Sequence, residues 1–417
     1  MSRAVDRWPL AFLFLVNPLL LLPFVADPAL ARWLVAAAVL AVVFLVSAQS
    51  RLAVAATWTE TWPLVGLAGL LLWHMGRGAP VAEGSRWLVL VVLGGLTYAY
   101  SRGLDRASRD RGLELMVMAG GALGVYAVLQ AAGWDVLRYP AESWMYRVVT
   151  TFGHRNFTAA FLLATVFAAL SRADRTGTKN RAFSPFLWPI LAGLLATGSR
   201  FPIVAAAVVV VVSLVRRRVL RTRSLVVVVV VAVLAVGVLI SSNLGWVVSR
   251  METISLRAEL YRTMVPLLGG QPLFGGGAGA FASAIPELAG PTTAQASANL
   301  AFLHAHLLPA ELQIELGLAG ILLAAAFVAP LYLGLVRQGW RRWDWLVWGH
   351  LAWLVVSLYD TAPFSYAGWI SLWPMLGFIR SDLQGEATNA IAKTAVRRAF
   401  GWLAVPAVCL CLSLIHI

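Results

Sequence analysis

Residues 225–239 read LVVVVVVAVLAVGVL, and this stretch decides the fold class of the chain. Every face of such a stretch is apolar, whereas the strands of a membrane barrel alternate apolar and polar side chains. Similar runs recur from end to end, since 60% of the 417 residues are hydrophobic and only 12% are charged. The sequence therefore predicts an all-α polytopic membrane protein.

Apolar runs long enough to cross a bilayer are separated by polar breaks, and they predict about twelve transmembrane helices in one integral membrane domain, residues 1–417. The first of them follows a basic start and is interpreted as an uncleaved helix, because further spans come after it. A further apolar run, 399–417, holds both cysteines, so neither a disulfide framework nor a thiolate metal site is predicted. The predicted spans are residues 8–25, 31–48, 56–75, 87–100, 114–133, 152–171, 185–199, 201–215, 224–241, 307–333, 343–359 and 368–379.

Basic residues are unevenly distributed among the breaks between these runs. With the N-terminus in the cytoplasm, alternate breaks on the cytoplasmic side receive most of the 33 lysines and arginines, including the cluster RRRVLRTR at 216–223. This is the positive-inside pattern of membrane proteins. The net charge of +14 therefore indicates topology, and no nucleic acid is expected as a partner.

One break, residues 242–306 between the ninth and tenth predicted spans, is long enough to form a substantial loop, which this topology places in the periplasm. Leu256, Leu260 and Met264 recur in it at helical spacing, which predicts a short helix. The glycine-rich segment PLFGGGAG at 272–279 ends that helix and predicts a flexible turn. The sequence thus predicts one long periplasmic loop that contains short helices.

Two histidines, His304 and His306, stand where this loop meets the apolar run 307–333. Ionisable groups at such a place are costly enough to suggest function, and a neutral imidazole is a suitable proton acceptor near pH 7. Arg200, at a break between two apolar runs, and Arg257, in the loop, lie on the same predicted side. Two guanidinium groups of this kind can bind a diphosphate bidentately. Taken alone, Arg200 also fits a snorkelling residue at the membrane rim.

Other chemistries lack the residues that they require. The spacing of His304 and His306 is too short for one helix face, and the outer side has no Asp-x-Asp pair, so no metal site is predicted. The glycines at 275–277 lack the Lys-Ser/Thr of a P-loop, and no Gly-x-Ser-x-Gly elbow occurs. What remains is group transfer from a donor that is already activated.

Five motifs share the predicted outer side of the membrane. They are FGHRNF at 152–157, TGSR at 197–200, Arg257-x-x-Leu260-Tyr261-Arg262, PLFGxG at 272–277, and His306-x8-Glu315-Leu316-Gly317-Leu318-x-Gly320. In their order and spacing they resemble the motifs of the O-antigen ligase and polymerase superfamily, which comprises polytopic membrane enzymes of the class C glycosyltransferase type. The resemblance covers roughly residues 152–320.

This resemblance implies a metal-independent glycosyltransferase without a cofactor, which takes a glycan from undecaprenyl diphosphate at the periplasmic face of the bacterial inner membrane. It implies that Arg200 and Arg257 hold the diphosphate, and that His306 activates the acceptor hydroxyl as a general base. Arg262 is a candidate third phosphate ligand, or alternatively an ion-pair partner of Glu259. Further candidates for supporting roles are His304, Tyr261, Glu315, Asn156 and Ser199. For Glu315, as for Glu311 on the same helix face, helix packing is the alternative reading.

The possible activities differ in their acceptor. In each of them membrane lipids are expected as further partners of the protein. The motif order, the twelve-helix plan and the lack of a large C-terminal periplasmic domain favour an O-antigen ligase, whose acceptor is a sugar of the lipid A core. A polymerase that extends another carrier-linked glycan is the main alternative, followed by a protein O-oligosaccharyltransferase and a carrier-lipid transporter. One position departs from the family pattern: members commonly have asparagine directly after the histidine, and this chain has Leu307.

Overall fold

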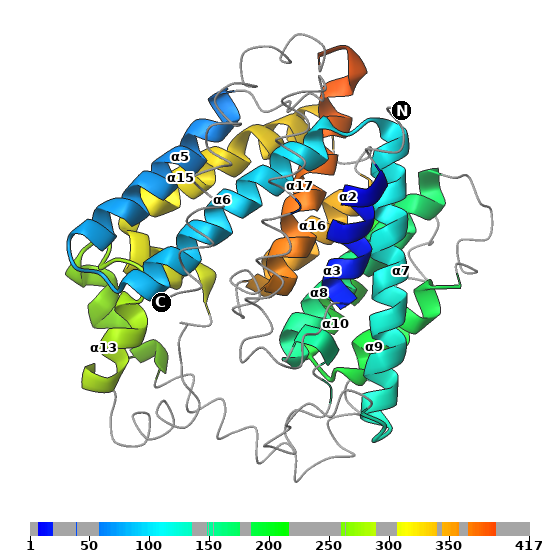
Figure 1. Cartoon of the computed structure of the whole chain (residues 1–417), viewed down its shortest axis with the longest axis horizontal. Coiled ribbons are helices and arrows are strands. Elements are labelled where there is room, and N and C mark those ends of the chain that lie inside the picture. Colours follow the sequence, from blue (N-terminus) through cyan, green and yellow to red (C-terminus); the bar gives the residue numbers. More distant parts are fainter. Residues whose placement is uncertain are drawn as a thin grey trace.

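The computed structural model describes residues 7–19, 39, 58–135, 148, 150–152, 154–175, 185–216, 260–262, 264–288, 307–339, 344–357 and 366–388. All elements in these segments are helices, and the segments contain no strand (Figure 1). The elements are α2 (Arg7–Ala11), η1 (Phe12–Val16), α3 (Asn17–Leu19), α5 (Trp58–Gly76), α6 (Val81–Gly103), α7 (Arg106–Ala131), η3 (Thr150–Phe152), α8 (Arg155–Arg175), α9 (Leu187–Ala196), α10 (Arg200–Arg216), α13 (Ala280–Leu288), α15 (Leu308–Gln338), α16 (Trp345–Ser357) and α17 (Tyr366–Thr388).

Helices are present at ten of the twelve predicted spans. The predicted span 224–241, the span 31–48 apart from Val39, and the run 399–417 lie outside the described residues. Among the described helices, α7, α8 and α15 are long and apolar enough to cross a membrane, while α9, α10 and α16 are shorter apolar helices. The chain is therefore a helical membrane protein.

Several helices extend beyond the apolar runs that predicted them. α7 begins at Arg106, well before the predicted span 114–133, because Asp105 caps it: the carboxylate accepts a 2.7 Å hydrogen bond from the Ser108 N–H. The helix ends at Ala131, shortly before Gly133, whose φ is +91°. Hydropathy marks the apolar part of a helix, whereas its ends are set by caps and by glycine.

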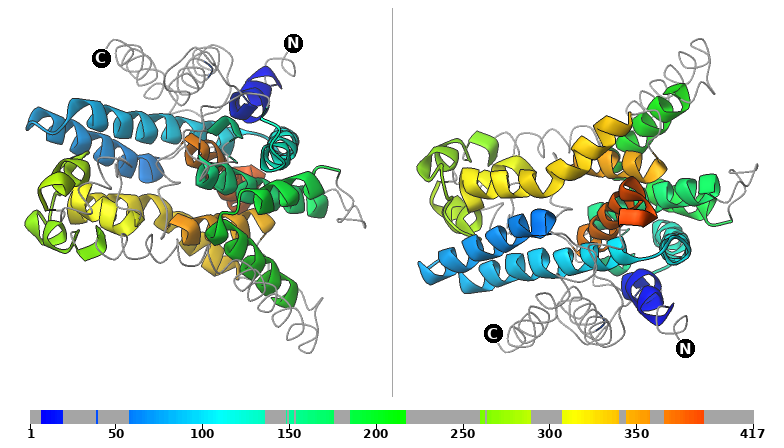
Figure 2. Two further views of the ribbon diagram at one scale, coloured as in Figure 1. Left: turned by 90° about the horizontal axis from the view of Figure 1, so that it is seen from below. Right: turned by 90° about the horizontal axis from the view of Figure 1, so that it is seen from above.

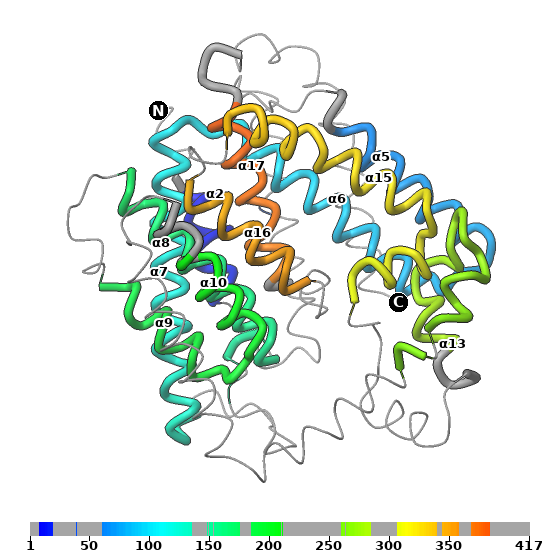
Figure 3. The backbone as a smooth tube through the Cα atoms, turned by 180° about the vertical axis from the view of Figure 1, so that it is seen from behind, coloured from blue at the N-terminus to red at the C-terminus, as the bar shows by residue number. Residues whose placement is uncertain are grey.

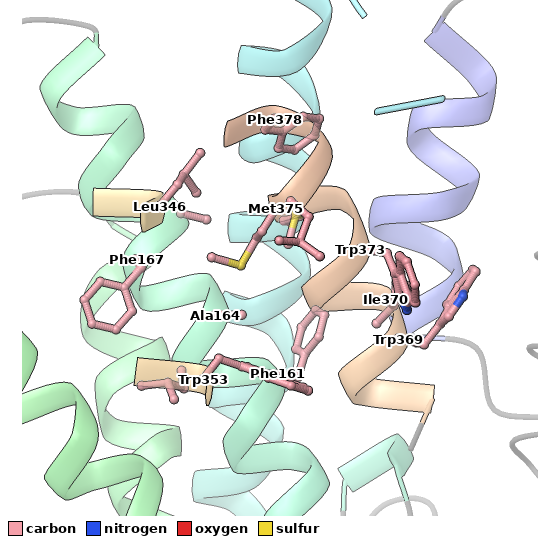
Figure 4. Close-up of a cluster of buried hydrophobic side chains, with 14 of the residues drawn as sticks. Phe161, Ala164, Phe167, Leu346, Trp353, Trp369, Ile370, Trp373, Met375 and Phe378 are labelled. Carbon is pink, nitrogen blue, oxygen red and sulfur yellow. The ribbon is translucent and has the colours of Figure 1, made fainter. Parts of the chain in front are cut away.

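α8 forms the centre of the larger helical group and contacts α7, α9, α10, α16 and α17. Figure 4 shows its side chains Phe161 and Phe167 in a cluster of buried hydrophobic residues that includes Trp353 of α16 and Met375 of α17, and both phenylalanines are fully buried. Gly349 of α16 allows this close packing, since an added Cβ would lie 2.5 Å from the Cβ of Phe167. Small residues at helix contacts are the usual means of tight packing in membranes.

A second group of helices lies beside the first. α5, α6 and α15 run side by side, and α17 contacts both α6 and α8, so that it joins the two groups (Figures 1 and 2). α13 lies at one end of α5 and α15, which places it at the lower left of Figure 1. Helix termini from distant parts of the sequence therefore gather at two opposite ends of the molecule.

One of these ends is rich in ion pairs, and we call it the ion-paired end. Arg175, at the end of α8, lies 2.9 Å from Asp344, 2.5 Å from Asp382 and 3.3 Å from Asp110. Asp382 also pairs with Arg109 at 3.1 Å. These residues come from α7, α8, the start of α16 and α17, so four distant segments are joined here by charge.

Candidate functional site

The opposite end, which we call the turn end, contains the predicted site residues that the structure describes. The start of α8 and the α9–α10 turn meet there, although more than forty residues separate them (Figure 3). The contact is a hydrogen bond: the Ser199 hydroxyl donates to Asn156 Oδ1 over 2.9 Å. Two of the sequence motifs, FGHRNF and TGSR, are thereby brought together.

The α9–α10 turn is shaped by its own side chains. Thr197 donates its hydroxyl to the carbonyl of Leu194 at 2.7 Å and accepts from the N–H of Ser199 at 3.2 Å. Gly198 adopts φ +62°, a left-handed conformation that favours glycine. Thr197 and Ser199 are buried, whereas Arg200 is exposed at the first position of α10. The turn therefore presents the Arg200 guanidinium at a helix N-terminus.

The start of α8 is arranged in a similar way. His154 lies directly before the helix, and its Nδ1 accepts a 3.2 Å hydrogen bond from the N–H of Asn156. The Oδ1 of Asn156 in turn holds Ser199, so the amide side chain links the first turns of α8 and α10. Helix N-termini carry partial positive charge, and two adjacent ones favour an anion.

A second part of the turn end is built around a break in α15. The helix is interrupted at Gly317, which adopts φ +65° and ψ −167°. The sequence predicted a membrane span over 307–333, and a helix is present there, but hydropathy did not predict the break within it. Breaking a helix leaves carbonyls on one side and N–H groups on the other without their normal partners.

The glycine-rich turn supplies these partners. The N–H groups of Gly276 and Gly277 donate to the carbonyls of Ile314 and Glu315 at 2.8 and 2.9 Å. In the other direction, the N–H groups that follow the break, those of Leu318 and Ala319, donate to the carbonyls of Pro272 and Leu273 at 2.9 Å each. The turn expected at 272–279 is present, but it is fixed by four backbone hydrogen bonds and is not the flexible turn that was predicted.

Glycine is required on both sides of this contact. A Cβ on Gly317 would lie 2.5 Å from the backbone nitrogen of Gly275, and a Cβ on Gly275 would lie 2.5 Å from the carbonyl carbon of Glu315. Gly275 and Gly277 also adopt positive φ values, +74° and +93°. The glycines of two sequence motifs thus serve one structural purpose, the close approach of two backbones.

Glu315 secures the next element along the chain. Its carboxylate accepts hydrogen bonds from the N–H groups of Gly279 and Phe281, the latter at 3.1 Å, and so caps the N-terminus of α13. The side chain is buried, at 1% exposure. Through these hydrogen bonds Glu315 positions α13 against α15, and its supporting role in the reaction stays a prediction.

A small apolar core completes this part. It consists of Leu260, Met264, Phe281, Ala310 and Ile314, and it holds the helical residues 264–270 and α13 against the start of α15. Leu260 and Met264, whose spacing predicted a short helix, lie in helical residues and are buried. Tyr261 packs partly against this core, and the neighbouring Arg262 is exposed.

Three of the predicted site residues, His304, His306 and Arg257, lie outside the described residues, and so does Glu259. The structure does describe Leu307, the residue after His306. Leu307 is extended, with φ −155° and ψ 98°, and it is the N-cap of α15 without a side-chain cap. The position where family members commonly have asparagine is therefore a helix N-cap, for which asparagine is among the preferred residues.

His74 makes a contact at the turn end that the sequence did not predict. It ends α5, and its Nε2 lies 2.7 Å from the carbonyl oxygen of Phe274 in the glycine-rich turn. No sequence pattern connects these residues, which are 200 positions apart. In the described segments, no group of three or more His, Cys, Asp or Glu side chains could hold a metal ion.

Comparison with protein families gives a match in the middle part of the chain. Residues 185–325 fit the family model described as O-antigen ligase, and this region runs from α9 through the glycine-rich turn and α13 into α15. It therefore contains the TGSR motif, the turn and the break at Gly317. No curated protein matches the sequence.

Proposed function

Because residues 185–325 match the O-antigen ligase family, we propose that the chain transfers a glycan from undecaprenyl diphosphate to a hydroxyl of the lipid A core. The reaction would take place at the periplasmic face of the bacterial inner membrane, without a metal ion. The observation that carries the proposal is the hydrogen bond between Ser199 and Asn156. It holds the starts of α8 and α10 together, with Arg200 exposed at the first turn of α10.

This arrangement supports diphosphate binding for two physical reasons. Two helix N-termini contribute partial positive charge, and the Arg200 guanidinium adds a full charge with two parallel donors. A diphosphate leaves readily once its developing negative charge is neutralised. In the proposal, Arg257 and Arg262 of the loop supply further cations, and the exposure of Arg262 is compatible with this role.

The proposed chemistry is a single displacement. The acceptor hydroxyl loses its proton to the imidazole of His306 and attacks the anomeric carbon of the donor sugar. The bond from that carbon to the phosphate oxygen breaks, and undecaprenyl diphosphate leaves with the bonding electrons. The histidine works as a general base and the arginines as electrostatic stabilisers, so no redox or nucleotide chemistry is involved.

The test is reconstitution of the purified protein with a carrier-linked glycan and, separately, two acceptors: lipid A core and a second carrier-linked glycan. Transfer to lipid A core, detected by mass, is the expected result. Extension of the carrier-linked glycan would instead make the protein a polymerase. The absence of product with both acceptors, from folded protein, would overturn the transferase proposal.

Variants test the residue roles. His306→Ala should abolish transfer, and full activity would remove the general-base assignment. Arg200→Gln should lower kcat/KM by about 100-fold, and Arg200→Lys should recover only part of this loss, because an ammonium group lacks the fork geometry. Arg86→Gln is the matched control, since Arg86 is an exposed arginine of α6 that pairs with Glu83.

A further inference from the structure

A pocket of about 400 Å³ lies at the turn end, between the end of α5 and the glycine-rich turn. Its lining includes Trp73, His74 and Arg77 from one side and Gln271 and Phe274 from the other. Ligand pockets in proteins usually measure about 300 to 1,000 Å³. At about 30 Å³ for each water in the liquid, this volume corresponds to about thirteen water molecules. That is room for a single sugar ring and its linkage.

The two walls are fixed to each other before any ligand binds. His74, at 5% exposure, contacts the Phe274 carbonyl through Nε2 at 2.7 Å. On the far wall, Gly276 donates to the Ile314 carbonyl of α15 at 2.8 Å. A site that is already formed binds its ligand without the cost of ordering loops.

The lining combines aromatic surface with hydrogen-bond donors. Trp73 and Phe274 are 42% and 50% exposed, and their ring centroids lie 5.4 Å apart with the planes tilted by 58°. The Arg77 guanidinium lies 5.0 Å from the Trp73 ring centroid, an arrangement that holds the cation against the aromatic wall. Gln271 adds an exposed amide, and none of the described residues that line the pocket carries a carboxylate.

A sugar ring matches this combination, since its C–H faces pack on aromatic rings and its hydroxyl groups need donors and acceptors. An acyl chain would leave the Arg77 and Gln271 groups without partners. A guanidinium in a pocket wall without a carboxylate favours an anionic substituent. We propose that this pocket is a glycan subsite, which takes a sugar ring bearing a carboxylate or phosphate and packs it on Trp73 and Phe274 with its anionic group toward Arg77.

The location suits a subsite of the proposed transferase, on which the biological role of this inference rests. Gly276, in the pocket wall, is bonded to Ile314, which lies six residues after the start of α15 at Leu308. At 1.5 Å per residue this separation is about 9 Å along the helix. The pocket wall is therefore bonded to α15 within about two helical turns of its start, which His306 precedes in the sequence.

Binding can be tested without transfer, by saturation-transfer-difference NMR on the full-length protein in nanodiscs of uncharged lipid. The probes are glucuronic acid, glucose 6-phosphate, glucose and inorganic phosphate. Both anionic sugars should bind more tightly than glucose, which identifies the sugar and its charge as recognition elements. If inorganic phosphate displaced the anionic sugars completely at equal concentration, the pocket would be an anion site and the glycan proposal would be wrong.

Two variants assign the binding to this pocket. Trp73→Ala should weaken all three sugars by about tenfold, whereas Arg77→Gln should weaken only the anionic sugars by about this factor. The matched controls are Trp188→Ala, whose side chain is 61% exposed on α9, and Arg86→Gln. Since Trp73 and Arg77 are exposed, their replacement should leave the thermal unfolding temperature unchanged. Unchanged sugar signals in both pocket variants would overturn the proposal.

The outcomes separate this inference from the proposed function. If the wild-type protein transfers glycan but both pocket variants keep the wild-type KM for their glycans, the subsite is wrong and the transferase stands. If the sugars bind as described but no acceptor yields product, the subsite stands as a glycan-binding site and the transferase proposal is wrong.

Discussion

The two ends of the helical bundle are held together by different means. At the ion-paired end, Arg175 and Arg109 lie against the carboxylates of α7, α16 and α17. At the turn end, backbone hydrogen bonds and glycines fix the geometry, and the buried carboxylate of Glu315 accepts from backbone N–H groups of α13. Arginines at this end, such as Arg77 and Arg200, have exposed side chains.

Charged side chains join helices at the ion-paired end, whereas the arginines named at the turn end lie at the surface. A buried or half-buried arginine that is surrounded by carboxylates contributes to folding and cannot easily bind a ligand. Where backbone groups and glycines determine the geometry, arginines can remain at the surface without loss of stability. The turn end therefore suits recognition of an anionic substrate, and the ion-paired end suits a structural role.

The largest effect is expected from Gly317→Ala, which tests whether the glycine contact determines the turn end. The methyl group would collide with the backbone of Gly275, and alanine would have to adopt a conformation that is essentially restricted to glycine. We expect a loss of about 3 kcal/mol or more, with loss of glycan transfer. Thermal unfolding of the purified protein in detergent would measure the change.

The control for this variant is Gly69→Ala. Gly69 is an exposed residue within α5, and an added Cβ would meet nothing within 4 Å. Alanine in a helix interior is favoured over glycine by about 0.5–1 kcal/mol. Gly69→Ala should therefore be neutral or stabilising, and equal destabilisation by both variants would contradict the proposed role of the Gly317 contact.

The second-largest effect is expected at the ion-paired end. Arg175→Ala removes a guanidinium whose side chain is only 12% exposed and leaves Asp110, Asp344 and Asp382 close to one another. Because these carboxylates are partly exposed, we expect a loss of about 2–3 kcal/mol, with an unchanged KM for glycan among the molecules that remain folded. Arg111→Ala, which breaks an exposed pair with Glu114, should cost less than about 1 kcal/mol. A large rise in KM for Arg175→Ala alone would contradict the separation of the two ends.

Glu315→Gln should have a smaller and more local effect. The amide retains one acceptor oxygen, but its NH₂ group would face an N–H donor of α13. We expect a loss of about 1–2 kcal/mol and faster hydrogen exchange at the amides of residues 279–281. Glu114→Gln at the ion-paired end is the control and should leave the exchange of these amides unchanged.

The sequence predicted the helical class and the positions of most described helices, since these depend on long apolar runs. It also singled out Ser199, Asn156, Glu315 and the glycine-rich segment, which make side-chain or backbone hydrogen bonds at the turn end, while their roles in catalysis stay predictions. It could not predict the break at Gly317, because a broken membrane helix is stable only when a distant segment supplies its missing hydrogen bonds. The local sequence around Gly317 does not indicate which distant segment supplies these hydrogen bonds.

For the same reason, the contacts of His74 and Asn156 could not be predicted from the sequence. The partner of His74 is a carbonyl group in the glycine-rich turn, and every residue has a carbonyl, so no residue type marks the contact. Asn156 and Ser199 are each common in loops, and only the meeting of α8 with the α9–α10 turn pairs them. The spacing of the motifs showed that they belong together, whereas the geometry that joins them depends on tertiary structure.

The smallest effect, and the only one expected to stabilise a helix end, concerns Leu307 at the start of α15. This N-cap lacks a side-chain acceptor, and the second helical residue, Pro309, has no N–H, so a cap could serve only the N–H of Ala310. Leu307 itself packs partly against the small apolar core. Leu307→Asn should add a cap worth about 1 kcal/mol and lose a similar amount of apolar burial, so its net change should be below about 1 kcal/mol.

Leu307→Ala separates these two contributions, because alanine loses the same packing without adding a cap. We expect Leu307→Asn to be more stable than Leu307→Ala by about 1 kcal/mol, and we expect slower hydrogen exchange at Ala310 in the asparagine variant alone. Equal stability and equal exchange in the two variants would mean that the backbone at Leu307 does not allow a side-chain cap. In that case the asparagine of family members would have a role other than capping, such as contact with the acceptor or with the adjacent histidine.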